Sequence, residues 1–273
     1  MRIQFNLIVG GFLTALVILA GLFAPWLSHL DPVLDADLMN AELPPDWTFW
    51  FGTDAQGRDI YTRVLYGARI SLTVGIVSQL INTVIGLALG ISAGYFGGWW
   101  DDLVNGLTNV MLAIPSLIFA IAIIAILGPG LPSLLIALGL TNWSWTCRIA
   151  RSSTLSLKGL GYVQAAKTLG YGNIRIMITQ LLPNMMGPIL VIGTLGMGGA
   201  VLSEAALSFL GLGIRPPFPS WGSMLTDARE LIVIAPWAAI FPGLAIFLSV
   251  LGFNLLGDGL RDMLDPHMRI RRA

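Results

Sequence analysis

Charged residues are scarce in this sequence of 273 residues. Asp, Glu, Lys and Arg together make up 11% of the chain, whereas apolar residues make up 55% and the mean hydropathy is +0.78. A soluble domain usually carries about 25% charged residues. The composition therefore excludes an ordinary soluble domain, and the formal net charge of zero gives no indication of a nucleic-acid partner.

Cysteine, histidine and the common catalytic motifs are also nearly or wholly missing. Cys147 is the only cysteine, so an internal disulfide is excluded. His29 and His267 are far apart in the sequence and are expected on opposite faces of a membrane, so we expect no metal site. The chain has no G-x-x-x-x-G-K-[ST] loop, no G-x-S-x-G elbow and no H-E-x-x-H pair. We therefore expect neither enzymatic activity nor a cofactor in this chain.

Long charge-free runs dominate the sequence instead: residues 3–30, 70–100, 103–147, 176–203 and 231–257. About 20 apolar residues suffice to cross the hydrocarbon core. The run 103–147 is too long for one helix and contains Gly128-Pro129-Gly130, a turn signal. We predict an all-α, multi-pass membrane protein that forms a single transmembrane domain over residues 1–273. The six predicted spans lie near residues 7–29, 70–95, 103–127, 131–150, 184–210 and 234–257.

The distribution of Lys and Arg predicts the orientation, because cytoplasmic loops carry an excess of basic residues. With the N-terminus inside, the smaller basic group lies outside: Arg58, Arg63, Arg69, Arg215 and Arg229. The larger group lies inside: Arg2, Arg148, Arg151, Lys158, Lys167, Arg175, Arg261, Arg269, Arg271 and Arg272. We therefore predict that both termini are cytoplasmic, with an external loop over residues 30–69 and a cytoplasmic loop over residues 151–183.

The predicted external loop is acidic and contains a possible helix start. Thr53 and Gln56 have capping-box spacing. Asp59 and Arg63 are four residues apart and can pair on one helix face. We interpret the segment before residue 70 as an amphipathic helix lying on the membrane surface, with a role of the acidic residues in binding solute as the less favoured alternative.

Two patterns of polar and small residues stand out inside the predicted spans. Ser78, Asn82, Gly86, Gly90 and Gly94 recur at every fourth position, which is typical of close helix packing. Gly196, Ala200, Glu204 and Ser208 show the same spacing in the fifth span. A charge there is costly and usually faces the protein interior or a water-filled cavity. Glu204, with Asn82 and Ser208 as further polar candidates, belongs either to a translocation pathway or to a structural pair.

The predicted cytoplasmic loop carries a recognisable motif. Residues 164–183, "QAAKTLGYGNIRIMITQLLP", resemble the signature of the permease subunits of ABC importers. The matching positions are Ala165, Ala166, Gly170, Leu182 and Pro183, while Gln164 and Gln180 replace the usual Glu and Ile.

The resemblance extends over most of the chain. "FGTDAQGRDIYTRVLYGARISL" (51–72), "AIPSL" (113–117), "EAALSFLGLGIRPPFPSWGSML" (204–225) and "FNLLGDGLRDMLDP" (253–266) are similar to the dipeptide, oligopeptide and nickel importer permeases. Each of these importers has two permease subunits, and the quoted segments resemble the second of the two. The resemblance does not distinguish peptides from nickel or a metal chelate as the solute.

The resemblance implies a larger assembly in the bacterial cytoplasmic (inner) membrane. Its partners would be a related permease that completes a heterodimer, two cytoplasmic ATPase subunits that hold ATP and Mg²⁺, and an extracytoplasmic solute-binding protein. The motif would form a cytoplasmic coupling helix between the fourth and fifth spans. The expected ATPase-docking residues are Gln164, Ala165, Ala166, Lys167, Leu169, Gly170 and Gly172.

The residues themselves agree with such a role, because small side chains let a helix sit deep in a groove of a partner. Gly170 and Gly172 permit a sharp turn. ATP binding would close the ATPase dimer and drive alternating access through the moving coupling helices. Two other functions stay open: a proton-coupled secondary carrier that uses Glu204, and a purely structural membrane subunit.

Overall fold

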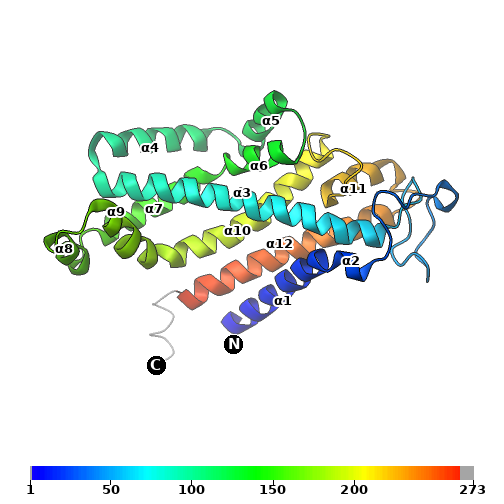
Figure 1. Cartoon of the computed structure of the whole chain (residues 1–273), viewed down its shortest axis with the longest axis horizontal. Helices are drawn as coiled ribbons and strands as arrows, with labels where there is room; N and C mark the ends of the chain where they lie inside the picture. The colour runs from blue at the N-terminus through cyan, green and yellow to red at the C-terminus, as the bar shows by residue number, and fades with distance from the viewer. Residues whose placement is uncertain (1, 265–273) are drawn as a thin grey trace.

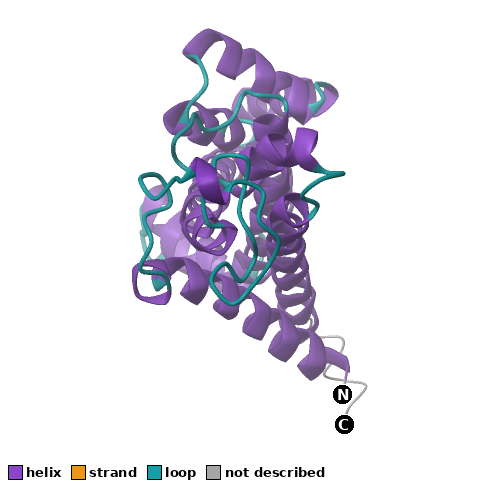
Figure 2. Ribbon diagram, turned by 90° about the vertical axis from the view of Figure 1, so that its right-hand side faces the viewer, coloured by secondary structure: helices purple, strands orange, loops and turns teal. Residues whose placement is uncertain are grey.

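The computed structural model describes residues 2–264, which fold into a helical bundle with a single isolated β-bridge between Thr53 and Asp59 (Figures 1 and 2). The end of the chain lies outside the described residues, together with His267 and the three arginines assigned to the cytoplasm there. The all-α prediction is confirmed for the part of the chain that the structure describes.

Four long helices coincide with four predicted spans. They are α1 (Arg2–Leu22), α3 (Ile60–Phe96), α10 (Leu182–Phe209) and α12 (Trp237–Leu264). Each is long and apolar enough to cross a membrane. In Figure 1, α3 runs along most of the bundle, and α1 lies beside α12, with which it has extensive contact. The sequence therefore located these helices from composition alone.

The predicted span over residues 103–127 is not one straight helix. The structure has α4 (Gly98–Ala113) and α5 (Ser116–Leu127), bent by 92° at the break between them. Pro115 lacks a backbone N–H and disfavours helical geometry in the preceding residue. Ile114 is accordingly extended, with φ −88° and ψ 125°. The pair α4 and α5 forms either a broken span or a re-entrant segment.

The predicted span over residues 131–150 is not one continuous helix either. It consists of α6 (Leu131–Gly139) and α7 (Trp143–Leu157), separated by a short turn. Asn82 of α3 lies at this break: its amide nitrogen donates to the Leu138 carbonyl (3.2 Å), and its oxygen accepts from the Asn142 N–H (3.0 Å). A buried side chain thus satisfies backbone groups that a continuous helix would have paired internally.

Shorter elements complete the chain. They are α2 (Ala24–Leu27), the 3₁₀ turns Leu38–Asn40 and Ala228–Leu231, α8 (Gly161–Thr168), α9 (Asn173–Ile176), the π-helical turn Met177–Leu181 and α11 (Trp221–Asp227). Figure 1 places α8 and α9 at one end of the bundle, and α2 and α11 at the other.

The start of α3 differs from the predicted capping box. Asp59 is the N-cap and accepts a 2.8 Å hydrogen bond from the Thr62 N–H. The Thr53 hydroxyl donates instead to the Asn40 carbonyl (2.6 Å). The first ten residues of the helix are largely buried, so they do not form a separate helix on the membrane surface. Arg63 pairs with Asp54 and Asp227 instead of Asp59.

The small-residue stripe of α3 packs against α7, as predicted. A Cβ added at Gly86 would lie 2.5 Å from the Cβ of Thr146, and one at Gly94 would lie 2.8 Å from that of Thr154. Contact between α3 and α7 is extensive. Only glycine allows the two backbones to approach this closely.

Candidate functional site

The segment with the permease signature forms α8 and the turn that follows it. The inner face of α8 carries Val163 and Ala166, which are buried in a cluster with Ile91 of α3, Ala150 of α7 and Ile176 of α9. These apolar contacts hold the short helix to the end of the bundle. They are needed because a helix of eight residues is too short to be stable alone.

The outer face of α8 remains exposed in this chain. The residues that the sequence assigns to docking divide accordingly: Ala166 is buried, and the exposed ones are Gln164, Ala165, Lys167, Leu169, Gly170 and Gly172. Leu169 is 74% exposed and Ile174 is 70% exposed. Sequence reasoning missed Ile174, although an apolar residue inside a polar stretch was the available signal.

Gly170 produces the sharp turn after α8. Its φ is +78°, in the left-handed region that favours glycine. The Gly170 N–H donates to the Lys167 carbonyl (2.9 Å), and the Tyr171 N–H donates to the Ala166 carbonyl (3.1 Å). This is the Schellman pattern of helix termination. Gly172 has a φ of −65°, which does not require glycine.

The basic residues of this region are fixed against the bundle. The Lys158 ammonium donates to the Gly94 carbonyl near the end of α3 (2.7 Å). The Lys167 ammonium lies 5.1 Å from the centre of the Tyr95 ring, and the Arg175 guanidinium lies 3.9 Å from that of Tyr171. The outer surface of α8 is thus apolar in part and is bordered by the positive charges of Lys167 and Arg175.

Glu204 lies elsewhere, fully buried between α3, α10 and α11. Its carboxylate accepts hydrogen bonds from Ser71 (3.0 Å) and from Ser208 (2.7 Å). The Ser71 hydroxyl in turn accepts from the Trp221 N–H of α11 (3.2 Å). Glu204 and Ser208 therefore belong to one polar cluster that joins three helices, whereas Asn82 lies apart at the α6–α7 break.

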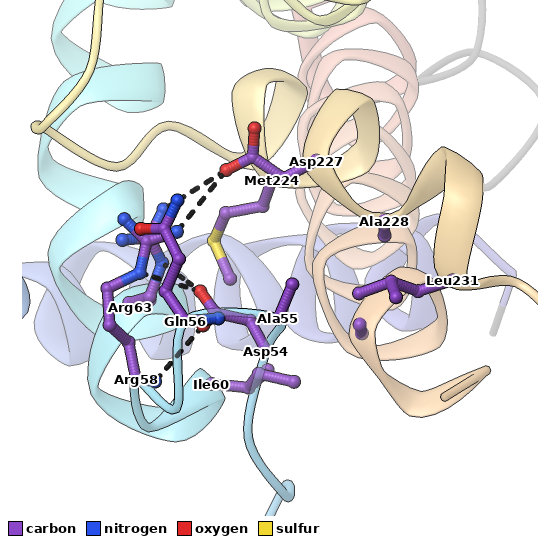
Figure 3. Close-up of a pocket in the computed structure, with 11 residues that line it drawn as sticks. Asp54, Ala55, Gln56, Arg58, Ile60, Arg63, Met224, Asp227, Ala228 and Leu231 are labelled. Atoms are coloured by element: carbon purple, nitrogen blue, oxygen red, sulfur yellow. Dashed lines mark hydrogen bonds and ion pairs between the residues drawn. The ribbon is translucent and has the colours of Figure 1, made fainter. Parts of the chain in front are cut away.

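A second group of charges lies where the 30–59 loop meets α3 and α11 (Figure 3). Asp54 accepts from the Arg58 Nε at 2.8 Å and lies 3.5 Å from the Arg63 Nε. Asp227 lies 3.5 Å and 3.6 Å from nitrogens of the same two arginines. Partial burial raises the pKa of the half-exposed Asp227 carboxyl, against the opposite influence of Arg63 and Arg58. The four side chains line a cavity of about 150 Å³.

Comparison with known proteins identifies the class to which this fold and its signature segment belong. The family described as "Binding-protein-dependent transport system inner membrane component" matches residues 86–270. A dipeptide transport system permease protein, DppC of Alkalihalophilus pseudofirmus, is 47% identical over 262 residues, covering 96% of this chain and 86% of that protein. A glutathione transport system permease protein, GsiD of Salmonella paratyphi A, is 45% identical over 263 residues with the same coverage.

Solved structures share the fold at lower identity. A chain of the inward-facing MetNI methionine ABC transporter matches with a TM-score of 0.58 and 19% identity, over 74% of this chain and 96% of that one. The molecule is therefore a multi-pass membrane permease. It belongs to the binding-protein-dependent transport system inner membrane component family, among the ABC importer permeases of the peptide family.

Proposed function

We propose that this chain is one permease subunit of an ATP-driven importer of short peptides and forms half of its translocation pathway. The observation that carries the proposal is the exposed outer face of α8 within the permease signature. Peptides are favoured over nickel or a metal chelate because the printed names of the relatives specify a dipeptide and glutathione. The heterodimer partner would be a related permease, and an extracytoplasmic binding protein would deliver the solute.

Two ATPase subunits would supply the hydrolysis and bind the outer face of α8. A groove that accepts this face needs an apolar floor for Leu169 and Ile174, which are largely exposed here. Acidic groups on its rim would complement Lys167 and Arg175. Because α8 is packed onto α3 and α7 through its inner face, a movement of the ATPases would be transmitted to these helices.

The proposed topology has six spans and both termini in the cytoplasm of a bacterium, with the protein in the inner membrane. Under this proposal, α4 with α5 and α6 with α7 form the third and fourth spans as broken helices. The basic residues around α8 support a cytoplasmic position. The carrier alternative has little support, since the Glu204 carboxylate faces serine hydroxyls in a fully buried cluster.

The docking proposal is tested with Ala165→Asp. A carboxylate buried without a partner in the groove costs at least several kcal/mol before relaxation, and a loss of about 3 kcal/mol is more than a hundredfold in affinity. The variant should reach the membrane and retain its sister permease, but lose the ATPases on purification and lose ATP-driven uptake.

Thr168→Ser is the matched control. Thr168 is also exposed on α8, and its hydroxyl donates to the Gln164 carbonyl, a bond that serine can keep. This variant should retain the ATPases normally. Normal ATPase recovery with Ala165→Asp would show that α8 is only a connector.

A further inference from the structure

The exposed surface of α4 is divided into two chemically different strips. Asp102, Asn105 and Asn109 are spaced by three and four residues, so they lie on one side of the helix, and all three are exposed. A neighbouring strip is apolar and also exposed: Trp99, Leu103, Leu107 and Val110. In a helix surrounded only by lipid, the polar strip would be energetically unfavourable.

The polar strip continues onto α7 through Arg148. The Arg148 Nη2 donates a 3.0 Å hydrogen bond to the Asn109 side-chain oxygen, and its guanidinium lies 6.0 Å from the centre of the Trp145 ring. Arg148 is exposed and makes no salt bridge within residues 2–264. Its positive charge is therefore uncompensated there.

The next arginine along α7 is different. Arg151 lies one turn further on and donates two hydrogen bonds to the Asp101 carboxylate, at 2.5 and 2.6 Å. Both arginines thus face α4, but only Arg151 is neutralised by an acid. The contrast separates a structural pair from a charge that is available to another molecule.

Arg148 also borders a hollow of about 390 Å³ at the level where both helix pairs are broken. Its lining includes Ile114, Pro115, Ser116, Thr141, Asn142 and Arg148. A space of this size with polar walls can hold several water molecules or a small charged group. The breaks of α4–α5 and α6–α7 therefore open beside the one uncompensated arginine of this part of α7.

The cost of placing these groups in lipid decides which surroundings they have. An arginine inside a bilayer is costly, and ionisable residues in spans normally face a protein interior or a water-filled cavity. Asp102, two asparagines and Arg148 share one continuous surface. That surface must face water or a polar partner, whereas the adjacent apolar strip suits lipid or an apolar helix.

We propose that the strip Asp102–Asn105–Asn109, together with Arg148 and the adjoining hollow, lines the aqueous path of the solute, and that Arg148 attracts the carboxylate of an anionic solute. The inference rests on the proposed function, because it presumes that a solute passes along this chain. It adds the position of the path and the residue that selects charge.

The test measures water access and local charge in the assembled importer, in nanodiscs, with Cys147→Ala as the parent. Ala113→Cys places a thiol one turn beyond Asn109 on the same face, where Ala113 is exposed. Leu107→Cys is the control on the apolar strip. Both thiols are treated with an anionic and a cationic methanethiosulfonate reagent of similar size.

Ala113→Cys should react at least about tenfold faster than Leu107→Cys, because the thiolate forms readily only in water. When Arg148→Gln is added, its rate with the anionic reagent should fall about fivefold and its rate with the cationic reagent should rise by a similar factor, since a unit charge a few ångströms away contributes about 1 kcal/mol in water. Arg148→Lys should preserve the ratio of the two rates.

Equal reaction at the two positions would mean that lipid or the sister permease covers the strip, and would overturn the proposal. An unchanged ratio with Arg148→Gln would overturn the role of Arg148. ATPase retention by the parent, and its ATP-driven uptake after reconstitution in proteoliposomes, are measured in parallel. Loss of these two activities refutes the proposed function, whereas the thiol results alone refute only this inference.

Discussion

The Ser71 hydroxyl of α3 donates a 3.0 Å hydrogen bond to the Glu204 carboxylate of α10, across 133 positions of the sequence. Ser208 donates to the other carboxylate oxygen at 2.7 Å. Because Ser71 also accepts from the Trp221 N–H, this contact couples the position of α11 to the packing of α3 on α10. The Glu204 carboxylate thus links α10 to α3, and through Ser71 to α11, by hydrogen bonds.

Glu204→Leu should therefore destabilise the permease more than Glu204→Gln. Leucine leaves two buried serine hydroxyls without their acceptor, and each unsatisfied group costs about 1–3 kcal/mol. Glutamine keeps the shape and one acceptor oxygen. We expect a clear drop in the thermal midpoint of the detergent-solubilised protein with leucine and a smaller one with glutamine. Equal midpoints for the leucine variant and the parent would contradict a structural role.

Arg63→Leu should cost about 1.5–3 kcal/mol, because it leaves the carboxylates of Asp54 and Asp227 with Arg58 as their shared partner. The Arg63 side chain is only 3% exposed. Arg69→Leu, six residues further along the same helix at an exposed position, is the matched control and should change stability by less than about 1 kcal/mol. Denaturant titration of both variants in mild detergent measures the difference. Similar losses in the free energy of unfolding for the two variants would show that the buried charge cluster does not stabilise the protein.

Gly86→Ala and Gly199→Ala should have effects of opposite sign. The added methyl at Gly86 meets Thr146 at 2.5 Å, whereas at Gly199 no atom lies within 4 Å. Overpacking typically costs about 1–3 kcal/mol, while alanine in an open helix position gains roughly 0.5–1 kcal/mol over glycine. Thermal unfolding of the two variants compares them directly. A neutral Gly86→Ala would mean that α3 and α7 can separate without cost.

Met39→Cys should be labelled by an impermeant thiol reagent added to intact cells, and Gly172→Cys should not. Met39 is 89% exposed in the loop before α3, and no atom lies within 4 Å of a Cβ at Gly172. Under the proposed topology, the basic residues around α8 favour a cytoplasmic position for residue 172. Permeabilising the cells should make Gly172→Cys reactive as well. The reverse labelling pattern would invert the proposed topology.

The sequence by itself located α1, α3, α10 and α12 and the signature segment of α8. A helix in lipid satisfies its backbone hydrogen bonds locally, so composition over about 20 residues is enough to predict it. The turn at Gly170 was likewise predictable, because it depends on one residue's φ.

Only the tertiary structure decided which side chains pair between elements, because these contacts depend on partners distant in the chain. Asn82 bonds on both sides of the α6–α7 break, across 56 and 60 positions. Arg63 pairs with Asp54 and Asp227 and leaves Asp59, its neighbour by helical spacing, to cap α3. Arg148 and Arg151 look equivalent in the sequence, but only Arg151 meets an acid on α4. Local propensity carries no information about these contacts, since each joins helices whose relative placement is set by packing of the whole bundle.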